Sequence, residues 1–278
     1  MGFAMEAAMH HFPLRLPRHG VSPRQVARAG DVWRLFQEAA VLASAEVGWT
    51  GERFITERVG FIVSRMTVLH HRELAYGEAV DASTWLRDWR RDTISRREVR
   101  LDVAGRRFAE ATQQWVHVAL GDDDDSITPE RASIDLLDAF PAVSVDEPMV
   151  KLPDIVTPVQ ASAHVWAFEV WHTWMDPFAH VNHPVYVDWC DESTSRCLVA
   201  AGLDPQDMVP VAEQVRFKRG LVGGTRGHVA TQLVGTTEAG DAVLRHRIEI
   251  ASGEVAADAI TVRRMRSESQ LDWLTVFR

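Results

Sequence analysis

The chain of 278 residues has few cysteines and no long apolar run, and each shortage excludes a class of protein. Its two cysteines, Cys190 and Cys197, form no CxxC pair. Seven residues of helix would place them about 10 Å apart along the axis, too far for a disulfide. No run approaches the roughly 18 apolar residues of a membrane-spanning helix, and Glu6 interrupts an N-terminus that lacks a basic region. We therefore expect a cytoplasmic protein without a signal peptide and without a membrane partner.

Positive charge is also scarce, because 30 Lys and Arg face 39 Asp and Glu, for a net charge of −9. A general polyanion binder carries a basic excess, so we expect no nucleic-acid partner. The acidity is local. Residues 121–150 hold nine acidic residues and one arginine, a net charge of −8, which leaves −1 for the rest of the chain. With Pro129, Pro141, Pro148 and Pro153 nearby, this stretch is typical of a linker on the surface.

The pattern of apolar residues predicts the same unit twice. Helical spacing covers Asp31 to Val47 and Pro184 to Ala201, and the glycines that follow, Gly48 and Gly202, are 154 residues apart. Each helix precedes β-rich runs of period two. These runs are residues 60–69, 79–89, 93–103 and 107–120 in the first half, and 209–218, 227–234, 242–251 and 254–265 in the second.

The two units predict an α+β protein in which each half is an antiparallel sheet wrapped around one long helix. We assign residues 1–120 to the first unit, 121–160 to the acidic linker and 161–278 to the second unit. One continuous domain with an acidic insertion is the alternative.

The most unusual segment runs from Trp171 to Tyr186 and ends where the second helix begins. It holds Asp176, three histidines (His172, His180 and His183) and Asn182, the one asparagine of the chain. A helix N-terminus offers free N–H groups that stabilise an oxyanion, and a neighbouring carboxylate serves as a base or a nucleophile. Simple turn chemistry at Asp176-Pro177 and a metal site built from the histidines and Asp176 are the alternatives. The spacing contains no HExxH pattern, so we expect no metal and no other cofactor.

Residues 176–186, Asp-Pro-Phe-Ala-His-Val-Asn-His-Pro-Val-Tyr, resemble the signature of hotdog-fold thioesterases of the 4-hydroxybenzoyl-CoA thioesterase type. Thr84-Trp85 and residues 111–116 resemble strands of acyl-ACP thioesterases, which are double hotdogs. The resemblance implies a tandem hotdog that hydrolyses an acyl-CoA or acyl-ACP thioester in fatty acid metabolism. The motif covers about 20 residues, and the broader pattern covers most of the chain more weakly.

Carried over position by position, the resemblance makes Asp176 the catalytic carboxylate, and the His183 N–H polarises the thioester carbonyl. His180 corresponds to the active-site histidine of acyl-ACP thioesterases, and Asn182 to the first Asn of a His-Val-Asn-Asn sequence. The second Asn is replaced by His183, the family's usual Gly by Ala179, and a further acid by Gly220. These four residues, Asp176, His180, Asn182 and His183, are the candidate catalytic set.

A second set of residues is expected to bind substrate. Phe178, Tyr186 and Trp174 flank Asp176 and are candidates for the acyl pocket. Three bases before a glycine-rich stretch, residues 220–227, are candidates for the phosphates of CoA or of a phosphopantetheine arm: Arg216, Lys218 and Arg219. That stretch lacks the Gly-Lys-Ser/Thr ending of a P-loop, so a hairpin connection is the alternative.

The 154-residue offset also compares the two candidate sites. It aligns Asp176 with Ser22, His180 with Val26, Asn182 with Arg28 and His183 with Ala29, so the first copy lacks every candidate group. We expect one active site per chain, in the second unit, with the first unit completing the acyl pocket. A hotdog hydratase or dehydratase and a non-catalytic acyl-thioester-binding protein are the alternatives. Association of two chains into a homodimer is also compatible with the pattern.

Overall fold

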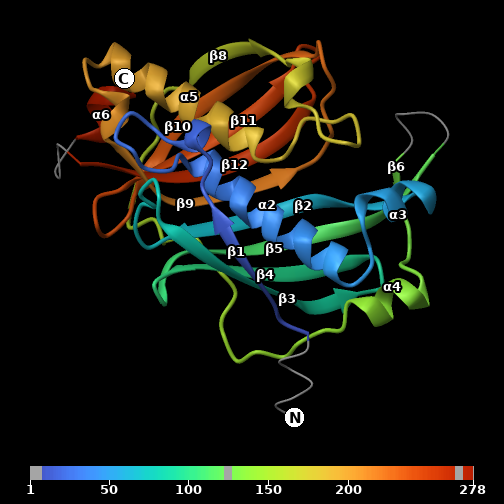
Figure 1. The fold of residues 1–278 in the computed structure, drawn as a ribbon. Helices are drawn as coiled ribbons and strands as arrows, with labels where there is room; N and C mark the ends of the chain where they lie inside the picture. The colour runs from blue at the N-terminus through green and yellow to red at the C-terminus, as the bar shows by residue number, and fades with distance from the viewer. Residues whose placement is uncertain (1–7, 122–126, 267–271, 278) are drawn as a thin grey trace.

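The structure is a computed structural model that describes residues 8–121, 127–266 and 272–277. It consists mostly of antiparallel sheet with two long helices (Figure 1). No helix in these described ranges has the length and apolar character needed to cross a membrane.

In the first half, the long helix α2 (Ala29–Glu46) lies against the sheet. Its buried residues recur at three- and four-residue spacing, which gives the helix one apolar side facing β1, β3 and β4. A short helix α3 (Gly51–Thr56) and a 3-10 turn η1 (Arg18–Gly20) flank it. The strands are β1 (His10–Arg15), β2 (Val59–His70), β3 (Ala79–Arg90), β4 (Ile94–Val103) and β5 (Arg106–Leu120).

The second half repeats this order around the helix α5 (Val185–Ala200), which contacts β8, β9 and β10. In sequence, the 3-10 turns η2 (His172–Trp174) and η3 (Pro205–Asp207) precede and follow α5. The short helix α6 (Trp273–Val276) contacts α5. The strands are β8 (His164–Glu169), β9 (Met208–Phe217), β10 (Arg226–Thr236), β11 (Ala242–Ile250) and β12 (Val255–Met265).

The acidic segment between the halves packs partly onto the first half. Its strand β6 (Ile127–Pro129) pairs with β5, and it also contains a short helix α4 (Ile134–Ala139). Leu136, Phe140 and Val143 are buried, so apolar side chains anchor this segment despite its charge. A short strand β7 (Thr157–Pro158) pairs with β10. The four consecutive aspartates, residues 122–125, lie outside the described residues.

The two helices and the eight long strands predicted from periodicity are confirmed, with bounds that differ by at most two residues. The sequence analysis missed β1 and β8, which are short and have one buried residue each. Their bounds are 154 residues apart, as are those of η1 and η2. The offset already present in the sequence could therefore have located both strands.

The strands form one continuous sheet in the order β1-β3-β4-β5-β2-β9-β12-β11-β10-β7, with β8 also paired to β10. The strand order of the second half is thus the reverse of that of the first, and the pairing of β2 with β9 joins the two halves. Thr67 pairs with Gln214 at the middle of that junction, and the Gln214 Nε2 donates to Thr67 Oγ1 at 2.9 Å. Because these positions are equivalent in the two halves, the junction relates the halves by an approximate twofold.

Helices α2 and α5 also meet across this junction (Figure 1). The Nη2 of Arg34 donates to Oδ2 of Asp188 at 2.5 Å, and these two residues are again 154 apart. Gly30 permits the close approach, because a Cβ there would lie 1.9 Å from Oδ1 of Asp188. The first half therefore lies directly beside the start of α5.

Candidate active site

Asp176 lies in the loop between η2 and α5, and the loop is closed by its own backbone. The Asp176 N–H donates to the His180 carbonyl at 2.7 Å, and Ala179 adopts φ +57° to allow this turn. The Oδ1 of Asp176 accepts the N–H groups of Phe178 at 2.9 Å and His180 at 3.4 Å. The carboxylate is therefore fixed by the turn that contains it.

Burial raises the pKa of Asp176, and the N–H groups of Phe178 and His180 oppose that rise by stabilising the charged form. A partly desolvated carboxylate with a raised pKa is a stronger base than an exposed aspartate. The same group would attack an electrophile more readily because water solvates it less.

His183 precedes α5 and lines the same cavity as Asp176. The His183 N–H makes no hydrogen bond to any described residue, as expected for a donor that precedes a helix. Its imidazole is enclosed by aromatic rings, with ring centroids of Trp33, Trp115 and Phe217 at 6.0 to 6.2 Å. Burial, with a contribution from Arg34, lowers the pKa of His183 to about 3, so this imidazole is neutral at pH 7. The backbone N–H is thus the group at this position suited to an oxyanion.

His180 approaches the backbone at Gly220. A Cβ at Gly220 would lie 2.3 Å from Cδ2 of His180, so only glycine leaves room for the ring. The position that the sequence resemblance aligned with an acid is therefore occupied by a glycine, which leaves space for the His180 ring.

A cavity of about 840 Å³ brings the loop together with the first half of the chain. From the second half it is lined by Asp176, Phe178, His180, His183 and Tyr186. From the first half its lining is mainly aromatic and aliphatic (Trp49, Phe54, Phe61, Leu86, Trp89 and Trp115), and the connecting segment adds Phe140. The candidate base and a large apolar surface therefore share one cavity.

No protein-family model matches the chain, and no curated protein sequence matches it either. Solved structures do match. A Lactobacillus plantarum protein assigned as an oleoyl thioesterase has a TM-score of 0.76 and 17% identity, covering 92% of this chain and 96% of its own. The fold is that of the hotdog thioesterases.

Two further thioesterases match over nearly the whole chain. An acyl-ACP thioesterase from Bacteroides thetaiotaomicron has a TM-score of 0.69 and 13% identity, covering 94% of this chain and 99% of its own. The 12:0-ACP thioesterase from Umbellularia californica has a TM-score of 0.70 and 16% identity, covering 95% and 96%. The predicted resemblance to hotdog thioesterases is confirmed at the level of the fold.

Within this hotdog fold, Lys218 and Arg219 line the cavity as well. Lys218 forms an ion pair with Asp258 at 2.5 Å, and Arg219 forms one with Glu254. Both side chains are about half exposed, so solvent screens these pairs and leaves the cations available to an incoming phosphate. Tyr186 donates its hydroxyl to the Arg219 carbonyl at 3.5 Å, and burial raises the pKa of this phenol, which stays protonated.

Three of the candidate residues are not among the described residues that line the cavity: Asn182, Trp174 and Arg216. Trp174 stacks on Trp171 with ring centroids 4.8 Å apart and also contacts Trp189. Arg216 is exposed and lies opposite Arg65 across the β2–β9 junction. The Asn182 Oδ1 is buried and has no hydrogen-bond partner among the described residues. These three residues therefore lie outside the lining of the cavity.

Residues 8–121, 127–266 and 272–277 contain no group of three or more His, Cys, Asp or Glu side chains that could hold a metal. The two cysteines are free and buried.

The sequence analysis missed the first-half lining of the cavity, including Trp115 and Arg97. A signal for Arg97 was present. Alternate residues of a strand point to the same face, so Arg97 shares a face of β4 with Val99 and Leu101, which are fully buried. An arginine therefore lies on the apolar face of this strand. No sequence pattern showed that this face opens into the space beside Asp176.

Proposed function

We propose that the protein is a tandem-hotdog thioesterase that hydrolyses an acyl thioester of CoA or of acyl carrier protein to a free acid and a thiol. The observation that carries the proposal is that Asp176 shares one cavity with the unbonded N–H at the start of α5 and with the apolar lining of the first half. The thioesterase fold supports the same assignment.

In this proposal the acyl chain lies against the aromatic lining of the first half. The thioester carbonyl then sits between Asp176 and the His183 N–H, which stabilises negative charge on the oxygen. Lys218 and Arg219 would meet the phosphates of the thiol-bearing group.

Hydrolysis follows by one of two routes. As a base, Asp176 takes a proton from water, the resulting hydroxide attacks the carbonyl carbon, and the C–S bond breaks as the thiolate takes up the proton. As a nucleophile, the Asp176 carboxylate displaces the thiolate to give a mixed anhydride; water then cleaves the anhydride into the free acid and the Asp176 carboxylate, and the proton released goes to the thiolate. Single-turnover hydrolysis in ¹⁸O-labelled water separates the routes, because only the anhydride route can leave label in the aspartate.

Thiol release from a panel of acyl-CoA and acyl-ACP substrates of different chain lengths tests the function. The wild-type chain should release thiol from at least one of them, and Asp176→Asn should remain folded and lose about 10³-fold in rate. Asn keeps an acceptor for the Phe178 N–H, so circular dichroism and thermal melting should be unchanged.

Asp176 and His180 both line the cavity and could together form the acid–base pair that a hydratase requires. Adding an enoyl-CoA substrate to the assay therefore distinguishes hydration of a double bond from thioester hydrolysis. Loss of the enoyl absorbance without thiol release would show that the protein is a hydratase and not a thioesterase. If neither reaction occurs with any substrate, the protein would be a non-catalytic binding protein.

A further inference from the structure

Three arginines are buried in the described part of the chain, and one of them differs from the other two. The exposed fractions are 6% for Arg97, 1% for Arg100 and 0% for Arg263. Arg263 pairs with Asp191 at 2.8 Å and with Glu213 at 2.5 Å. A buried guanidinium is normally compensated in this way, because an isolated buried charge is strongly destabilising.

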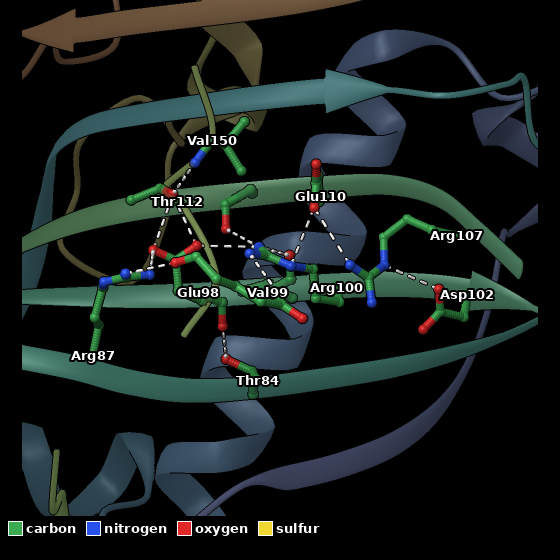
Figure 2. Close-up of polar contacts among 12 residues, drawn as sticks. Thr84, Arg87, Glu98, Val99, Arg100, Asp102, Arg107, Glu110, Thr112 and Val150 are labelled. Atoms are coloured by element: carbon green, nitrogen blue, oxygen red, sulfur yellow. Dashed lines mark hydrogen bonds and ion pairs between the residues drawn. The ribbon is translucent and has the colours of Figure 1, made fainter. Parts of the chain in front are cut away.

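Arg100 lies in an acidic cluster on one face of β4 (Figure 2). It pairs with Glu98 at 3.1 Å, Glu110 at 3.2 Å and Glu147 at 3.4 Å, so the acidic segment between the halves supplies one of its partners. Thr112 holds Glu98 in place through its hydroxyl, at 3.0 Å from Oε1. The positive charge of Arg100 is therefore balanced by carboxylates of the protein itself.

Arg97 lies three residues earlier on the same strand, on the opposite face, and lines the cavity. Its Nη1 donates to Thr84 Oγ1 at 3.3 Å, and its guanidinium lies 5.6 Å from the centre of the Phe140 ring. It forms no ion pair with any described residue. Burial lowers the pKa of Arg97 to about 10, which leaves it protonated at pH 7.

The neighbours of Arg97 are uncharged: Gln113 pairs with it on β5, Thr84 accepts its hydrogen bond, and Ser95 lies two residues earlier on the same face of β4. Leu86 is its neighbour on β3, and Trp89 and Phe140 line the same part of the space. A permanent cation without a charged partner among the described residues therefore faces a part of the cavity lined mainly by apolar side chains of the first half and of the segment that follows it, whereas Asp176 belongs to the second half. A guanidinium presents its N–H groups in a planar fork that matches a carboxylate.

We propose that Arg97 recognises a carboxylate at the far end of the acyl group, so that the preferred substrates are thioesters whose acyl chain carries a second, terminal acid. This inference rests on the proposed function for the orientation of the thioester, and it narrows that function to one substrate class. A methyl-terminated chain would leave the buried charge uncompensated and would bind less well.

The test uses binding, which does not require hydrolysis. The probes are alkyl-CoA thioethers of several chain lengths, which have no thioester to cleave, and each length ends either in a carboxylate or in a methyl group. Calorimetry should show the carboxylate-ended probe binding the wild-type chain about 10- to 100-fold more tightly at the best length, the range of a hydrogen bond to a charged group.

Two matched variants locate the effect on one face of β4. Arg97→Met should abolish the preference for the carboxylate and leave the melting temperature of the ligand-free protein unchanged or higher, because it removes an uncompensated charge. Arg100→Met should keep the preference for the carboxylate. It should lower the melting temperature by about 10 °C, because buried Glu98 would lose its ion pair with Arg100.

The outcomes separate this inference from the proposed function. Selective binding that Arg97→Met abolishes supports the inference even if no thioester is hydrolysed. Equal binding of both probes by the wild-type chain overturns it, even if thioesters are hydrolysed. A preference that survives in Arg97→Met also overturns it, as does a loss of stability in Arg97→Met equal to that of Arg100→Met, since Arg97 would then be structural.

Discussion

The loops that precede α2 and α5 have the same backbone and different chemistry. In the first, the Ser22 N–H donates to Val26 O at 2.8 Å and Gln25 has φ +62°; in the second, the Asp176 N–H donates to His180 O at 2.7 Å and Ala179 has φ +57°. A backbone bridge closes both, between Val21 and Ala27 and between Met175 and Val181. One turn thus carries a carboxylate and an imidazole in one copy, and a hydroxyl and an isopropyl group in the other.

The difference between the loops is also one of location. Asp176 and His180 line the cavity, whereas none of the described residues 18–28 does. The first half contributes instead through its helix and strands, which supply the apolar wall. In the proposed function, the second copy thus holds the reacting groups and the first copy supplies the wall of the acyl pocket.

Making the second loop like the first should have the largest effect. Asp176→Ser reproduces the Ser22 side chain and should reduce thioester hydrolysis on the order of 10³-fold, because no other carboxylate lines the cavity within the described ranges. The reciprocal change, Ser22→Asp, should leave the rate unchanged and create no second site, since that loop does not reach the cavity. Thiol release measures both. A gain of activity in Asp176→Ser/Ser22→Asp over Asp176→Ser would contradict the assignment of a single site.

The second comparison concerns the core at the junction, where Glu213 in the second half occupies the position of Met66 in the first. Glu213 is fully buried and bonds to His70 Nε2 at 2.8 Å, Trp33 Nε1 at 3.1 Å and Arg263. Glu213→Gln should lower the free energy of unfolding by about 3 kcal/mol, because Arg263 would lose a buried partner. Met66→Leu, which conserves volume, should cost less than about 1.5 kcal/mol. Chemical denaturation measures both, and equal losses would exclude the ionic explanation.

The same residue predicts an acid dependence of stability. Burial alone would raise the pKa of Glu213, but His70 and Arg263 outweigh it and lower the pKa to about 2 from an ordinary 4.5. The unfolded chain therefore binds a proton that the folded chain does not, so this contribution is present above pH 4.5 and is lost as the pH falls toward 2. The free energy of unfolding of Glu213→Gln should fall less steeply than that of the wild type over this window.

A smaller effect is expected where Gly220 in the second half corresponds to Glu73 in the first. Gly220→Ala would force a Cβ onto the His180 ring and should reduce kcat/KM about 10-fold by displacing that ring. Glu73→Ala removes an ion pair with Arg24 but nothing near the cavity, so kcat/KM should be unchanged. Steady-state kinetics measures both, and a full-rate Gly220→Ala enzyme would show that the position of His180 is unimportant.

Much of the fold followed from local patterns. Alternation of period two located eight strands, and helical spacing with a glycine after the last turn located α2 and α5. The 154-residue offset predicted that the first copy lacks the candidate side chains. Strands β1 and β8 were missed because short, half-exposed segments have too few buried residues to show a period.

The sequence by itself determined the repeated unit and the loop that holds Asp176, because both depend on contacts between residues near one another in the chain. The tertiary structure alone decided which surfaces meet. Pairing of β2 with β9 brings the apolar wall of the first half to the start of α5, and it places Arg97 and Asp176 on one cavity although 79 residues separate them. Periodicity shows which face of a strand is buried, but whether that face packs against a side chain or opens into a cavity depends on partners that are distant in sequence.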